Sequence, residues 1–140
     1  MLSVNFWAVL VSAIVAMAIG FLWYGPLLGK QWAASMGWSE AQMQEKMKKG
    51  MGMSYAIMFV GALLMAYVLA RAVSYGLVFR GFSPINAGLS FSIANWIGFV
   101  VPATVGGVLW EGKPWKWWFI TAGYYLVTLI VMGLILANWQ

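Results

Sequence analysis

The sequence predicts an all-α integral membrane protein, a four-helix bundle with a short amphipathic surface helix in its first inner loop. Two observations predict this fold class. Of the 140 residues, 64% are hydrophobic and only 8% are charged, whereas about 25% of the residues in a soluble domain are charged. The apolar residues also gather into four runs, each close to the roughly 20 residues that a helix needs to cross the hydrocarbon core. We therefore expect one transmembrane domain over residues 1–140.

The four apolar runs predict spans over residues 4–24, 53–73, 87–110 and 117–138. They are hydrophobic all round rather than on one face, which is typical of helices buried in lipid. Small residues recur along each run, and in lipid such residues allow helices to pack closely. They either pack the bundle or shape a ligand groove: Ala8, Ser12, Ala16 and Gly20; Ser54, Ala62, Ala66 and Ala70; Ser90, Ala94, Gly98, Pro102 and Gly106; Gly133 and Ala137.

A further helix is expected over residues 40–49, between the first and second spans. Ser39 is a favourable N-cap, and Gln42 three residues later completes a capping box. Lysines in the last turn complement the helix dipole, and Gly50 is suited to end the helix. This segment is polar enough to lie on the membrane surface rather than in it.

The basic residues predict the orientation of the spans. Four spans place both termini on one side, and the loops on the other side hold six of the eight basic residues. Because basic loops stay in the cytoplasm, we expect a multi-pass protein of the bacterial inner membrane with both termini outside. The net charge of +5 then indicates anionic lipid headgroups as partners rather than nucleic acid.

The composition argues against several kinds of chemistry. The chain has no Cys and no His, so thiolate nucleophiles, imidazole bases and the usual zinc sites are excluded. The three acidic residues, Glu40, Glu45 and Glu111, lie outside the apolar runs, which disfavours transport coupled through a carboxylate inside the membrane. We expect no catalytic residues, no metal and no cofactor, and therefore no enzyme.

One short motif occurs twice. The stretches GFLWYGP at residues 20–26 and GVLWEGKP at residues 107–114 share the pattern Gly-x-Leu-Trp-x-Gly, each at the inner end of an odd-numbered span. The repeat indicates either two duplicated helical hairpins in the same orientation or chance in a chain rich in these residues. As a paired inner-face site it makes binding candidates of Trp23, Tyr24, Pro26, Trp110 and Glu111. For Glu111, an ion pair with a nearby lysine is the alternative.

Four further residues are binding candidates because of their position inside a span. Asn95 and Trp96 lie near the middle of the third span, where a side-chain amide needs a hydrogen-bond partner. Asn95 therefore either bonds to another helix or lines a small-molecule site. Pro102 removes a backbone donor and predicts a kink. Tyr124 is one of several hydroxyl-bearing residues that predict a polar cluster in the inner half of the fourth span.

Landmarks along nearly the whole chain support a family resemblance. They are NFWAV near the amino terminus, LWYGPLLGKQW, NWIGFVVPAT, LWEGKPWKWW and GYYL followed by MGLILANW. With these landmarks in order, the chain resembles bacterial family 1761 of the domains of unknown function. The resemblance implies a small multi-pass membrane protein and no particular activity. The family's recurrent features correspond by position to Trp23, Tyr24, Pro26, Gly29, Trp32, Gly98, Phe99, Pro102, Glu111, Gly123 and Tyr124.

Two functions remain open from the sequence. The first is a small protein, expected to form a homo-oligomer, that binds or scaffolds a lipid, a hydrophobic molecule or a partner membrane protein. The alternative is a subunit of a small oligomeric transporter or channel that is not coupled through an intramembrane carboxylate.

Overall fold

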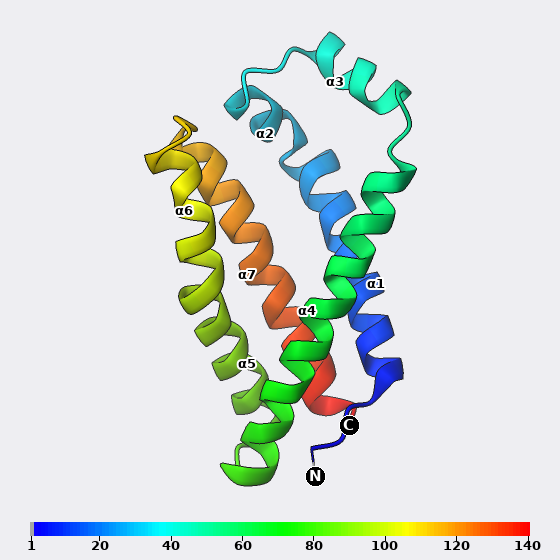
Figure 1. The fold of residues 1–140 in the computed structure, drawn as a ribbon, viewed down its shortest axis with the longest axis vertical. Helices are drawn as coiled ribbons and strands as arrows, with labels where there is room; N and C mark the ends of the chain where they lie inside the picture. The colour runs from blue at the N-terminus through cyan, green and yellow to red at the C-terminus, as the bar shows by residue number, and fades with distance from the viewer. Residues whose placement is uncertain (1) are drawn as a thin grey trace.

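The computed structural model describes residues 2–140, and every regular element in that range is helical, which confirms the all-α class (Figure 1). Two of the elements, η1 and η2, are short π-helical segments. In chain order the elements are α1 (Phe6–Leu22), η1 (Trp23–Leu27), α2 (Gly29–Ser35), α3 (Glu40–Lys48), α4 (Gly52–Phe79), α5 (Pro84–Asn95), η2 (Trp96–Val100), α6 (Val101–Leu109) and α7 (Trp115–Asn138).

Four helical stretches are long and apolar enough to cross a membrane: Phe6–Leu27, Gly52–Phe79, Pro84–Leu109 and Trp115–Asn138. The described amino-terminal end and the carboxyl terminus lie at the same end of the molecule, and α3 lies at the other end (Figure 1). The buried hydroxyl of Ser74 ties these terminal segments together. It lies 3.3 Å from the backbone oxygen of Ser3 and 3.1 Å from Oε1 of Gln140.

Helix α7 is the centre of the packing, because it contacts α1, α4, α5 and α6. Its closest approach is to α5, where Gly88 faces Gly133. A Cβ atom on Gly88 would lie only 2.9 Å from the backbone oxygen of Gly133. Nearby, the Ser92 hydroxyl donates to the backbone oxygen of Leu129 at 2.6 Å. Small residues thus bring the two backbones together, as expected for helices that associate in lipid.

The small residues that were predicted to pack the third span against its neighbours lie on the opposite face of that span, so this prediction is wrong. Ser90, Ala94, Gly98 and Pro102 are exposed, and the buried residues of this stretch are instead Ala87, Gly88, Ser92 and Gly107. The third span is apolar on all sides, so hydrophobic contrast gives no sign of which face meets its neighbours. The corresponding residues of α1, Ala8, Ser12 and Ala16, are buried as expected.

Both π-helical segments begin with the sequence Trp-x-Gly and lie close to a proline. In η1, Pro26 lies inside the segment and Gly25 leaves helical geometry, with φ −107° and ψ −105°. In η2, the N–H of Val101 bonds to the oxygen of Trp96, just before Pro102. Because a proline ring clashes with the carbonyl four residues earlier, a widened turn relieves the crowding. The predicted kink near Pro102 therefore takes the form of a π-helical turn.

The surface helix forms as its capping residues predict. Ser39 Oγ accepts from the N–H of Gln42 at 3.2 Å, and the Gln42 side chain accepts from the N–H of Ser39 at 2.8 Å. Gly50 follows the helix with φ +80°, in the left-handed region that favours glycine. Hydrogen bonds of the capping box therefore define the start of α3, and the left-handed conformation of Gly50 follows its end.

Candidate functional site

Two tryptophans, one from each π-helical segment, attach the odd-numbered spans to α7. The indole N–H of Trp23 donates to the backbone oxygen of Ile120 at 2.9 Å, and that of Trp96 donates to Ala122 at 2.7 Å. A helical carbonyl has a second lone pair with which to accept such a bond. Ile120 and Ala122 belong to one turn of α7, so the two bonds anchor that turn just before Tyr124.

Tyr124 crosses from α7 to α1. Its hydroxyl donates to the backbone oxygen of Ala16 at 3.1 Å, and the side chain is buried. Gly20 makes room for the phenol, because a Cβ there would lie 3.3 Å from the hydroxyl oxygen. The ring of Tyr24 lies 5.4 Å from that of Tyr124, centroid to centroid. The structure therefore brings Trp23, Tyr24 and Tyr124 together at one end of α7.

Beside Tyr124 lies a cavity of about 120 Å³ between α1, α4 and α7. Three methionines, a glycine without a close neighbour and two hydroxyl-bearing residues of α7 form much of its wall: Met17, Met58, Met65, Gly61, Tyr125 and Thr128. Met58 is 47% exposed, so the cavity opens onto the outer surface of the helices. Flexible thioether side chains adapt to occupants of different shape.

Thr128 places a polar atom on this largely apolar wall. The residue is 1% exposed, and its hydroxyl has no hydrogen-bond partner among the described residues. A buried polar group without a partner costs about 1–3 kcal/mol. The hydroxyl oxygen has almost no accessible surface of its own, so the wall that a bound molecule would meet beside Thr128 is essentially apolar.

The other sequence candidates lie elsewhere. Asn95 does not bond to another helix as predicted, because its Nδ2 donates to the Phe91 oxygen of its own helix at 2.7 Å. This four-residue back-bond satisfies the amide locally. Pro26 and Pro102 are exposed.

The second copy of the repeated motif is also separate from the cavity. Trp110 is 86% exposed, so it is no counterpart of Trp23. Glu111 pairs with Lys113 at 3.9 Å, and its side chain is 65% exposed. Such a pair contributes little to stability. The structural counterpart of Trp23 is Trp96, which makes the matching bond to α7.

Sequence reasoning missed the methionines and Gly61. Methionine is common in apolar spans, and nothing in the spacing of Met17, Met58 and Met65 marks them as neighbours. Only the crossing of α1 and α4 over α7 brings them to one cavity. The available signal was Gly61, the one glycine inside the second apolar run.

The comparisons with known proteins give one result. A family model described as "Protein of unknown function (DUF1761)" matches residues 7–137. Neither the curated proteins nor the solved structures gave a match.

Proposed function

We propose that this chain, which belongs to the DUF1761 family of proteins of unknown function, binds a hydrophobic molecule from the surrounding lipid. The observation that supports this proposal is the largely apolar cavity beside Tyr124, between α1, α4 and α7. An apolar cavity of about 150 Å³ accepts a benzene-sized guest. The 120 Å³ beside Thr128 suits a comparable fragment, such as several methylene groups or one ring.

The membrane setting is part of the proposal. Four helices of sufficient length and apolarity support a membrane protein, and we place it in the bacterial inner membrane. The basic residues around α3 support a cytoplasmic position for that end and an outside position for both termini. In this orientation the cavity opens to the hydrocarbon core, where its ligand is abundant.

The test is native mass spectrometry of the full chain released from gentle detergent. Gly61 lines the cavity, and a Cβ atom there would meet nothing within 4 Å, so we use Gly61→Leu to place a bulky side chain at the cavity wall. Gly98 is also exposed and free of neighbours, but it lies on the third span. We expect Gly61→Leu to lose the co-purifying hydrophobic ligand and Gly98→Leu to keep it. Equal ligand occupancy in both variants would refute the proposal.

The same spectra test the alternative inferred from the sequence, a subunit of a small oligomeric transporter or channel. They report the number of chains in each particle as well as bound molecules. A scaffold or binding protein works as a monomer or an oligomer, whereas the transporter alternative requires an oligomer. A strictly monomeric particle with bound ligand therefore supports the binding function over the transporter.

A further inference from the structure

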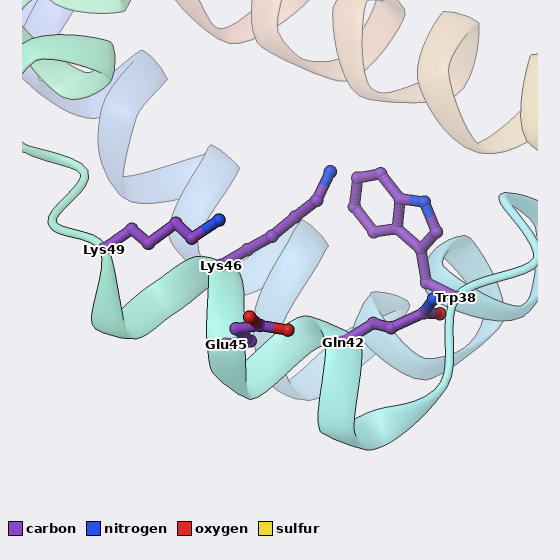
Figure 2. Close-up of a pocket in the computed structure, with 5 residues that line it drawn as sticks. All are labelled: Trp38, Gln42, Glu45, Lys46 and Lys49. Atoms are coloured by element: carbon purple, nitrogen blue, oxygen red, sulfur yellow. The ribbon is translucent and has the colours of Figure 1, made fainter.

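A second pocket, of about 210 Å³, lies on the surface helix at the end of the molecule opposite the termini. It is lined by Trp38, Gln42, Glu45, Lys46 and Lys49 (Figure 2). Gln42 is held by its capping bond to Ser39, so this wall of the pocket is fixed by the same hydrogen bonds that begin α3. One wall of the pocket is therefore formed by a residue of α3 whose side chain is held by a hydrogen bond.

Two ammonium groups give this pocket its chemistry. Lys46 Nζ lies 3.4 Å from the centroid of the Trp38 ring, a cation–π contact that fixes its position. Lys49 is the C-cap residue that follows α3, and Figure 2 shows both lysines extending above the ribbon. Glu45 lines the same pocket, and its single carboxylate leaves the pocket with a net positive charge beside the two ammonium groups. Ammonium groups are donors only, so the pocket suits a group with several acceptor oxygens, such as a phosphate.

A row of aromatic rings connects this pocket to the cavity. Trp38 contacts Trp32 at 5.1 Å, Trp32 contacts Tyr24 at 5.5 Å, and Tyr24 contacts Tyr124 at 5.4 Å, all between ring centroids. Trp38 lines the surface pocket and Tyr124 lines the cavity. The summed length of these three ring-to-ring distances is comparable with half the thickness of the hydrocarbon core, about 15 Å. An acyl chain has the length to reach from one pocket to the other.

We propose that the ligand is an anionic phospholipid whose phosphate is held by Lys46 and Lys49 and whose acyl chain enters the cavity beside Tyr124. This inference rests on the proposed function, since the cavity receives the chain. It adds a headgroup preference, which the apolar cavity by itself does not supply. Anionic lipid is favoured over a free phosphate because the aromatic row leads from the ammonium groups directly to an apolar site.

The test uses the full chain in detergent with equal amounts of dioleoyl phosphatidylglycerol and dioleoyl phosphatidylcholine, which share their acyl chains. Native mass spectrometry gives the ratio of the two bound lipids. A lysine near a membrane surface changes anionic-lipid binding by about fivefold. We expect the wild-type ratio to favour phosphatidylglycerol by at least about fivefold, and the double variant Lys46→Gln/Lys49→Gln to bring it close to one.

The matched control is Lys113→Gln/Lys116→Gln, which removes the same charge from the turn between α6 and α7 and from the first turn of α7. We expect this control to keep the wild-type ratio. An equal fall in both double variants would overturn the proposal, because the preference would then follow net charge rather than the pocket. Displacement of phosphatidylglycerol by inorganic phosphate at the same concentration would also overturn it, by showing a site for the free anion.

The variant Gly61→Leu separates this inference from the proposed function. If the wild type binds both lipids equally and Gly61→Leu loses both, the headgroup inference fails and the cavity function stands. If Gly61→Leu keeps all lipid while Lys46→Gln/Lys49→Gln changes the ratio, the cavity function fails, and with it the proposed path of the acyl chain. If Gly61→Leu loses both lipids and the lysine variant binds phosphatidylglycerol and phosphatidylcholine equally, the cavity function and the headgroup preference are both supported.

Discussion

Tyr124 on α7 donates its phenolic hydroxyl to the backbone oxygen of Ala16 on α1, across 3.1 Å. The bond joins the first and last long helices at the wall of the cavity. It fixes the ring that lines the cavity, so the proposed binding function predicts that stability and ligand binding depend on the same contact.

Replacing Tyr124 by phenylalanine is expected to lower the free energy of unfolding by about 0.5–1 kcal/mol, the usual net contribution of one such bond. The Ala16 oxygen keeps its helical partner, which limits the loss. Thermal unfolding in detergent measures the change. Tyr125→Phe is the control, because the Tyr125 hydroxyl makes no hydrogen bond among the described residues, and an equal loss in both variants would contradict the assigned bond.

The approach of α5 to α7 at Gly88 predicts a larger effect. In Gly88→Ala the new Cβ meets the backbone of Gly133 at 2.9 Å and that of Leu134 at 3.1 Å. Backbone atoms do not move aside as a flexible side chain does, and overpacking of this kind costs about 1–3 kcal/mol. Gly98→Ala meets no atom within 4 Å and is expected to be neutral. Circular dichroism melting in detergent distinguishes the two, and similar melting temperatures would refute this packing.

The two copies of the repeated motif are expected to respond differently to the same change. Trp23→Phe removes the bond to Ile120 and leaves space over Gly123, where the indole now fits. We expect a loss of about 1–2 kcal/mol in unfolding free energy. Trp110 is 86% exposed, so Trp110→Phe should stay within about 0.5 kcal/mol of wild type. Equal losses would indicate that both tryptophans have the same structural role.

Thr128→Val tests the unpaired hydroxyl. The two side chains have nearly the same shape, and removing a buried donor without a partner is neutral or stabilising by up to about 1 kcal/mol. We expect this result in delipidated protein, measured by chemical unfolding in detergent. Marked destabilisation of the delipidated protein would show instead that the hydroxyl already has a partner.

Single introduced cysteines test the orientation of the chain in the membrane. Any labelling reports the introduced residue, because the chain has no cysteine of its own. Gln44 is exposed on α3 and uncharged, so Gln44→Cys leaves the distribution of basic residues unchanged. An impermeant thiol reagent applied to intact cells should not label it. It should label Ser3→Cys, which lies at the opposite end. Labelling of Gln44→Cys alone would invert the proposed topology.

Much of the architecture was predictable because it depends on local sequence. Apolar runs of sufficient length predict the four long helices, and the capping box at Ser39 and Gln42 predicts where α3 begins. The proline at position 102 predicts a distortion of the third span. Each of these features depends on residues that are close together in the chain.

The candidate site was predictable only in part. Trp23, Tyr24 and Tyr124 were each predicted as binding candidates, and the structure places Trp23 against Gly123 and Tyr24 against Tyr124. Asn95 lies inside the third long helical stretch, as predicted. Its hydrogen-bond partner was not predicted, because its amide donates to the oxygen of Phe91 in its own helix rather than to another helix.

Apolar helices of membrane-spanning length, with a capped polar helix between them, follow from the local sequence alone. Which helix faces meet, why Trp23 packs against α7 and Trp110 does not, and which methionines line one cavity depend on the tertiary structure. The physical reason is that a span apolar on every side carries little contrast between its faces. Which face is buried then depends on how closely backbones approach, as at Gly88 and Gly133, and that is a property of two helices together.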